Sequence, residues 1–169
     1  MFRFISGTDH YNKVLVRVAT VKRMLWIGTA DIKDLYVKVG STTQPFLAIL
    51  SLLIRRGVEV RLIHAKEPGP NFRKDFDKYP VLNRLERVLC PRVHFKMLVF
   101  DGKEVYVGSA NLTGAGIGMK ARDKRNFEVG ILTDDSEIVE QAMNQFDEVW
   151  MGKHCKSCKR RDFCTDPIA

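Results

Sequence analysis

One stretch constrains the fold of this chain more than any other: residues 93–111, with the sequence VHFKMLVFDGKEVYVGSAN. Its first half is apolar except for His94 and Lys96, which stand two residues apart and so share one face of a β-strand. Asp101-Gly102 is a strong signal for a two-residue turn, and a second run of strand-forming residues follows it. The stretch therefore predicts an antiparallel hairpin.

The length of the hairpin loop decides which polar side chains meet. Directly paired residues of the two strands point to the same face. A loop one residue longer or shorter than Asp101-Gly102 would send Ser109 and Asn111 to the opposite face. The two-residue loop predicts these pairs: Phe100 with Lys103, Leu98 with Val105, Lys96 with Val107, and His94 with Ser109. Four polar side chains would then form one patch: His94, Lys96, Ser109 and Asn111.

The spacing of this stretch is His-x-Lys, then Asp after four residues, then Gly-Ser-x-Asn after six more. It resembles the HKD signature of the phospholipase D superfamily, whose members cleave or exchange phosphodiesters through a phosphohistidine. The resemblance implies that His94 is the nucleophile and that Lys96 and Asn111 neutralise the phosphoryl oxygens. Ser109 can donate a further hydrogen bond to phosphate, and Gly108 is a structural residue of the motif.

Two acidic residues receive different roles. Asp101 falls at the predicted turn, so we expect it to fix the hairpin rather than contact substrate. Glu128 lies on the next predicted strand, where the superfamily often has an acidic residue. We expect Glu128 to accept the second imidazole N–H of His94, which would fix the tautomer of the ring. Asp134 and Asp135 are nearby alternatives for this role.

The implied mechanism needs a second histidine as general acid, and the chain has one complete motif. His64-x-Lys66 repeats the beginning of the motif, but position 71 is Asn and no Gly-Ser-x-Asn follows, so we reject it as a second copy. Small single-motif members of the superfamily form homodimers. The resemblance therefore implies a twofold homodimer with one composite active site and no metal or other cofactor for catalysis.

The rest of the chain predicts an α/β fold, a mixed, mostly parallel sheet flanked by helices on both faces. The predicted domain covers residues 1–151, followed by a basic, cysteine-rich tail at 152–169. A strand–helix–strand succession predicts one parallel pair with a helical crossover. The predicted elements are helices at 11–21, 45–56 and 136–150, strands at 24–30, 58–63 and 126–132, a possible helical turn within 31–40, and a helical segment at 71–89 interrupted at Pro80.

The net charge of +8 and the pI near 9.5 favour a polyanionic substrate when combined with the motif. We expect a small endonuclease acting on DNA or RNA. The alternatives are a phospholipase or cardiolipin-type lipid phosphodiesterase, and a nucleic-acid-binding module with weak catalysis. No signal peptide or membrane-spanning run is evident, which predicts a cytoplasmic protein. Predicted substrate contacts lie just after the motif, in a glycine-rich turn and a basic loop: Thr113, Lys120, Arg122, Lys124 and Arg125.

Three of the four cysteines lie in the tail, spaced Cys-x2-Cys-x5-Cys. In a cytoplasmic chain such clustering favours a metal over disulfides. A structural zinc would take Cys155, Cys158, Cys164 and either Cys90 or His154. The same spacing with one upstream cysteine resembles the iron–sulfur cluster site of some DNA-processing nucleases, which leaves an iron–sulfur cluster as the alternative.

Overall fold

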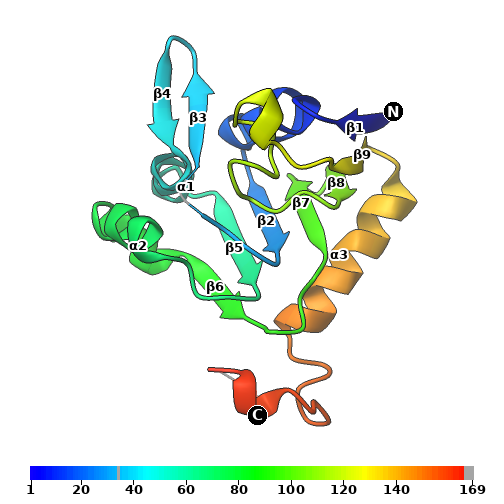
Figure 1. Ribbon diagram of the computed structural model, residues 1–169. Helices are drawn as coiled ribbons and strands as arrows, with labels where there is room; N and C mark the ends of the chain where they lie inside the picture. Colours follow the sequence, from blue (N-terminus) through cyan, green and yellow to red (C-terminus); the bar gives the residue numbers. More distant parts are fainter. Residues whose placement is uncertain (34, 166–169) are drawn as a thin grey trace.

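The computed structural model describes residues 1–33 and 35–165, and its centre is a seven-stranded sheet (Figure 1). The order across the sheet is β1-β9-β8-β7-β2-β5-β6. The strands are β1 Phe2–Ser6, β2 Met24–Thr29, β5 Glu59–His64, β6 Glu86–Leu89, β7 Lys96–Phe100, β8 Glu104–Gly108 and β9 Val129–Thr133.

The sheet is mixed, as predicted, but the expectation that it is mostly parallel is wrong. Only β2 with β5 and β5 with β6 pair in parallel, and the other pairings in this sheet are antiparallel. The predicted crossover from β2 to β5 is present. The antiparallel majority arises because β7, β8 and β9 follow one another in sequence and in space, and because the unpredicted strand β1 pairs with β9.

Helices cover both faces of the sheet, as predicted. Helix α1 (Phe46–Arg55) and helix α2 (Pro70–Asp77) lie on one face, and helix α3 (Ser136–Trp150) packs on the other (Figure 1). Helix α1 ends before Gly57, whose φ of 80° suits a glycine. The side chain of Asp135 caps α3 by accepting the backbone N–H groups of Glu137 and Ile138.

Several local predictions need correction. The predicted first helix is one π-helical turn, His10–Val14, followed by a 3-10 helix, Leu15–Thr20. The possible helical turn within 31–40 is instead the strand β3 (Tyr36–Val39), which pairs with β4 (Thr42–Pro45); position 34 lies outside the described residues. The helical segment at 71–89 ends with a 3-10 helix, Pro80–Arg84, and then strand β6. Strand β9 begins three residues later than predicted, at Val129.

The motif forms the predicted hairpin of β7 and β8, but in a different register. The N–H of Lys103 donates to the carbonyl of Phe100 at 3.0 Å, and Asp101 and Gly102 both have positive φ, which is the predicted two-residue turn. Phe100 nevertheless pairs with Glu104, so Lys103 is an extra residue between turn and strand. All the predicted pairs are therefore shifted by one residue, and the ladder ends with Lys96 opposite Gly108. The predicted pairing of His94 with Ser109 is wrong, so strand pairing does not place Ser109 and Asn111 on the face of His94 and Lys96.

Asp101 ties this turn to the beginning of β2. Its Oδ1 accepts the backbone N–H groups of Lys22, Arg23 and Met24, at 3.1, 2.7 and 3.2 Å. Partial burial of the carboxyl opposes ionisation, but these three donors and the charge of Arg23 hold the pKa of Asp101 below its usual value of 3.8. The residue thus lies at the end of the hairpin remote from His94.

Replacing Asp101 by alanine should lower the free energy of unfolding by roughly 3 kcal/mol, because three amides lose an ionised acceptor and alanine is strained at positive φ. Asp101→Asn should lose less, since it keeps an oxygen acceptor and tolerates this φ. Because the pKa is lower in the folded state, the stabilisation is complete above about pH 4 and is lost as the pH falls further. Urea unfolding at pH 7 and pH 3 checks this; an equal difference between wild type and Asp101→Ala at both pH values would contradict it.

Candidate active site

The polar residues of the motif gather at one end of four adjacent strands. Strands β2 and β8 end here at Thr29 and Gly108, while β7 and β9 begin here at Lys96 and Val129. Pairing of β2 with β7 runs up to Gly28 and Met97, so Thr29 and Lys96 come next on neighbouring strands. Alternating directions of the strands therefore bring residues far apart in sequence to one edge of the sheet.

His94 and Lys96 contact each other directly. His94 is exposed, whereas Lys96 is only 6% exposed. The Lys96 Nζ donates to the backbone carbonyl of His94 at 2.7 Å and lies 3.2 and 3.3 Å from the two ring nitrogens. Burial lowers the pKa of Lys96, although the charge of Glu128 opposes the shift.

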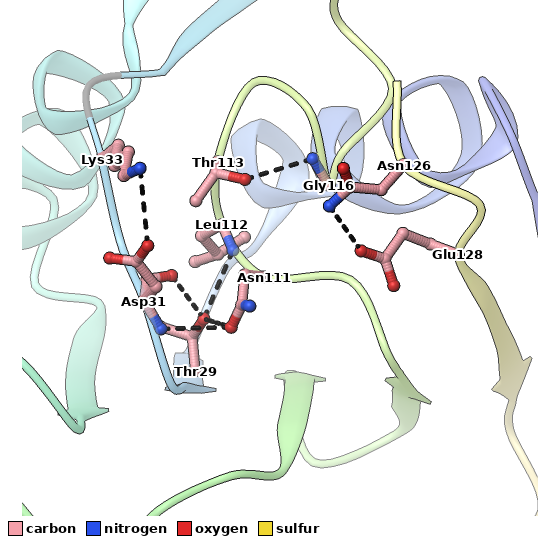
Figure 2. A network of polar contacts seen from close by, with 9 residues as sticks. All are labelled: Thr29, Asp31, Lys33, Asn111, Leu112, Thr113, Gly116, Asn126 and Glu128. Carbon is pink, nitrogen blue, oxygen red and sulfur yellow. Dashed lines mark hydrogen bonds and ion pairs between the residues drawn. The ribbon is translucent and has the colours of Figure 1, made fainter. Parts of the chain in front are cut away.

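The side-chain amide of Asn111 has a fixed orientation (Figure 2). Its Oδ1 accepts the backbone N–H of Asp31 at 3.1 Å and lies 3.4 Å from the hydroxyl of Thr29. That hydroxyl donates to the Asp31 carbonyl at 2.8 Å and accepts the N–H of Leu112 at 3.3 Å. Because a backbone N–H can only donate, Oδ1 is the atom held by Asp31, and the two N–H bonds of Nδ2, which have no hydrogen-bond partner among residues 1–33 and 35–165, can donate to an anion.

Ser109 and Glu128 form a second hydrogen-bonded group. The hydroxyl of Ser109 donates to the carboxylate of Glu128 and accepts the N–H of Val129 at 3.1 Å. The other carboxylate oxygen of Glu128 accepts from Asn126 Nδ2 at 3.1 Å (Figure 2). Within the described part of the chain, Glu128 makes no hydrogen bond to His94, so the expected contact between their side chains is not formed. Glu128 binds Ser109 and Asn126 instead.

The two alternatives to Glu128 are engaged elsewhere. Asp135 caps helix α3, and Asp134 pairs with the amino terminus of Met1. Of the three acidic candidates, Glu128 is thus the one whose charge acts on Lys96.

Gly108 and Gly130 leave room for the ring of Tyr106 at the site. They are paired across β8 and β9, and a side chain on either would collide with the Tyr106 ring or hydroxyl. The hydroxyl is buried, and burial raises the pKa of Tyr106. His10 meets this ring edge-on at 5.7 Å between centroids, and burial lowers the pKa of His10. Nothing in the sequence pattern indicated this packing.

Gly108→Ala should destabilise the protein by about 1–3 kcal/mol, because the new Cβ would stand 2.6 Å from the Val129 carbonyl oxygen and 2.8 Å from the Gly130 Cα. Both are backbone atoms of the paired strand, which cannot move without breaking the ladder. Gly114→Ala is the matched control, since its nearest neighbours would be Lys120 side-chain atoms at 3.6 Å. Equal denaturation midpoints for the two variants would contradict the expected clash.

The segment after Asn111 folds back against it. A Cβ on Gly116 would lie 2.6 Å from the Asn111 carbonyl oxygen, so this position requires glycine. The hydroxyl of Thr113, a predicted substrate contact, accepts the N–H of Gly116 at 3.1 Å and thus also shapes the loop (Figure 2). The predicted basic loop follows, and among the residues described none of its cations pairs with a carboxylate: Lys120, Arg122, Lys124 and Arg125.

Sequence reasoning missed Thr29 and Asp31, which hold the amide of Asn111. The rejected His64 is the last residue of β5 and is buried; its Nδ1 lies 2.6 Å from the Lys66 carbonyl oxygen. Burial lowers the pKa of His64. No helix in residues 1–33 or 35–165 is long and apolar enough to cross a membrane.

Comparisons with known proteins match a domain family and the fold of this chain. A family model described as "Cardiolipin synthase, PLD-like domain" matches residues 22–150. NucT from Helicobacter pylori is 17% identical, with a TM-score of 0.65 over 88% of this chain and 94% of that one. Nuc from Salmonella typhimurium, described as a phospholipase D family member, is 15% identical, with a TM-score of 0.65 over 89% and 95%.

A further structure is TrmBL2, described as an archaeal chromatin protein with a novel mode of DNA binding. It is 16% identical, with a TM-score of 0.58 over 89% of this chain and 52% of that one. A search of curated proteins found no match.

Proposed function

Because this chain belongs to the phospholipase D-like (PLD-like) domain family, we propose that it is a metal-independent phosphodiesterase that cleaves nucleic acid through a phosphohistidine on His94. The observation that carries the proposal is the orientation of Asn111. Its amide oxygen is tied to Asp31, and its N–H groups, unpartnered within the described residues, can donate at the edge where Lys96 contacts His94. An exposed nucleophile beside an ammonium and an oriented amide suits an anionic phosphodiester.

In the first step, a ring nitrogen of His94 attacks phosphorus and the bond to the leaving oxygen breaks. Lys96 and Asn111 stabilise the charge on the non-bridging oxygens. The leaving oxygen takes a proton from the partner subunit's His94, which acts as general acid. In the second step, water attacks phosphorus, the P–N bond breaks, and the partner subunit's His94 takes the proton of the water. Ser109 and Glu128 orient the groups around the phosphate.

The proposed partner is a second copy of this chain. Apolar side chains are exposed on the α3 side of the sheet edge, and Phe4, Ile131 and Val107 are direct neighbours across β1, β9 and β8. This exposed row continues through Val129, whose carbonyl accepts the N–H of Ser109. An apolar surface that reaches the site is what a composite site in a homodimer requires.

Introducing a negative charge on this apolar surface tests the homodimer. Phe4, which is 66% exposed, changed to Asp should convert a dimer into a monomer in light-scattering measurements and remove activity. Leu52→Asp, at a 40% exposed position on helix α1, is the control and should leave the dimer intact. Wild-type protein that is monomeric yet active would refute the composite site.

Nucleic acid is favoured as substrate by positive charge in the loop that follows the motif and in the tail. The basic loop at 120–125 follows Asn111, and the tail carries exposed cations that form no ion pair among the residues described: Lys156, Lys159, Arg160 and Arg161. Such cations bind phosphate backbones with release of counterions. The DNA-binding description of TrmBL2 is consistent with this substrate class.

Labelled DNA and RNA incubated with the protein in EDTA test the proposal. We expect cleavage by the wild type and a phosphorylated histidine peptide at His94 in quenched samples. A parallel assay with bis(4-nitrophenyl) phosphate measures phosphodiester hydrolysis independently of whether the protein recognises nucleic acid or lipid. Phosphatidylcholine and cardiolipin vesicles test the lipid alternative. Cleavage of lipid but not of DNA or RNA would overturn the nucleic-acid assignment. No hydrolysis of any phosphodiester would overturn the enzyme itself.

A further inference from the structure

The three cysteines of the tail lie next to Cys90, which is far from them in sequence. Cys90 follows strand β6, and the C-terminal segment lies under the loop joining β6 to β7 (Figure 1). Cys90, Cys155 and Cys158 line a single cavity of about 240 Å³. The thiol of Cys164 lies 3.7 Å from the carbonyl oxygen of Leu89, the residue before Cys90. The four thiols thus come from two separate parts of the chain to the same region, beside the loop joining β6 to β7.

Burial along the tail singles out the same residues. From Lys153 to Thr165, every residue is exposed except Cys155, Cys158 and Cys164, which are half-buried. The segment therefore has no apolar core of its own, and Phe163 is 67% exposed against the guanidinium of Arg160. A basic segment of this length has little reason to fold back on the sheet unless the inward-facing thiols are held there.

The backbone around Cys155 and Cys158 favours binding of one metal centre by both thiols. The N–H of Cys155 donates to the carbonyl of Gly152, and the N–H of Cys158 donates to the carbonyl of Cys155, which forms tight turns around the Cys-x2-Cys. The Sγ of Cys158 receives the backbone N–H of Arg160 at 3.4 Å and lies 3.7 Å from the Arg92 guanidinium. N–H donors to sulfur are the outer contacts that stabilise thiolate ligands.

We propose that one metal centre is bound here by four thiolates, those of Cys90, Cys155, Cys158 and Cys164. None of the four forms a disulfide. In the described residues no three His, Cys, Asp or Glu side chains already stand close enough to hold an ion, so binding draws the thiols inward and closes the tail on the sheet. Four sulfur ligands suit zinc or an iron–sulfur cluster. His154 lines the same cavity, but its Nε2 is engaged by the carboxylate of Glu148 at 3.1 Å and only Nδ1 is left to face a metal, so we assign the fourth position to the thiol of Cys90.

The centre would be structural and would fasten the segment that carries the nucleophile. The N–H of Val93 donates to the carbonyl of Cys90 at 3.0 Å, and Val93 and Phe95 line the same cavity as the thiols. The proposal stands independently of the reaction, since its readouts are metal content, thiol protection and stability.

The first experiment is elemental analysis and visible spectroscopy of the full chain purified without oxygen or chelators. We expect about one zinc per chain in a colourless protein, or about four iron with acid-labile sulfide in a brown one. Either result supports the centre and identifies the metal. Wild-type protein containing less than about a tenth of an equivalent of either metal would overturn it.

The ligand assignment is tested by variants. Cys90→Ser should lose the metal, whereas His154→Ala should keep it. The reverse result would refute Cys90 as the fourth ligand. If Cys90→Ser does not fold, alkylation of the wild type decides: all four thiols should be protected until a chelator is added and should then react together. Thiols that react equally fast with and without chelator would contradict the proposal.

Discussion

His94→Ala should abolish hydrolysis of nucleic acid and of bis(4-nitrophenyl) phosphate, with a loss of at least about a thousandfold in kcat. The proposed dimer uses this residue twice, as nucleophile in one subunit and as general acid in the other. Folding should be unaffected, since the side chain is exposed and Lys96 is the one hydrogen-bond partner of its ring among the residues described. An unchanged thermal midpoint is the control.

Mixed dimers make the test sharper. If each dimer needs both histidines, activity should fall with the square of the wild-type fraction when wild type and His94→Ala are unfolded and refolded together. An equal mixture should then give about a quarter of the wild-type rate. A rate proportional to the wild-type fraction would show that each subunit works alone, which would refute the composite site while leaving the nucleophile assignment intact.

Asn111→Asp should lower kcat/KM by about 10²–10³-fold, because a carboxylate removes both N–H donors and adds negative charge where the phosphodiester binds. One oxygen of the new carboxylate can still accept the N–H of Asp31, so the loop should keep its position. The new charge would also partly neutralise the buried Lys96 ammonium. Asn111→Ala is the comparison: it loses the donors without adding charge, and it should retain more activity than the aspartate variant.

The order of these two variants distinguishes the proposed role from a merely structural one. A structural asparagine would tolerate Asp better than Ala, because Asp preserves the contact with Asp31. We therefore expect stability to decrease from wild type to Asn111→Asp to Asn111→Ala. Activity should decrease in a different order, from wild type to Asn111→Ala to Asn111→Asp. Steady-state kinetics and urea unfolding measure the two rankings, and identical rankings would count against a direct contact between Asn111 and the phosphate.

The sequence predicted the elements around the motif well where local signals were strong. Helix α3 spans the predicted residues 136–150, and the turn at Asp101-Gly102 forms as expected. The predicted register was wrong because a bulge directly after a turn does not change the alternation of apolar and polar residues along the sequence. The same sequence is compatible with Lys103 paired in the ladder or left out of it. Strand β1 was missed because the edge strand has two exposed phenylalanines and no clear polar alternation.

The sequence indicated the residues of the candidate site but not the contacts that hold them. Spacing alone indicated His94, Lys96 and Asn111, but the bonds that orient Asn111 come from Thr29 and Asp31, some eighty positions earlier. Contacts between distant segments depend on strand order, which local patterns do not encode. The partner of Glu128 depended on the same information: the structure joins it to Ser109 and Asn126 rather than to His94.

The motif holds strand β2 at both ends. Asp101 binds the amide of Met24, the first residue of β2, and Asn111 lies against Thr29, its last residue. The distance between Asp101 and Asn111 therefore has to match the length of β2, a strand that lies outside the motif. Inserting or deleting one residue within Met24–Thr29 would leave every motif residue in place in the sequence, yet it would release either the turn or the amide. Such length changes should be less tolerated than any single substitution in this strand. The motif would then depend on the length of β2, although none of the motif residues lies in that strand.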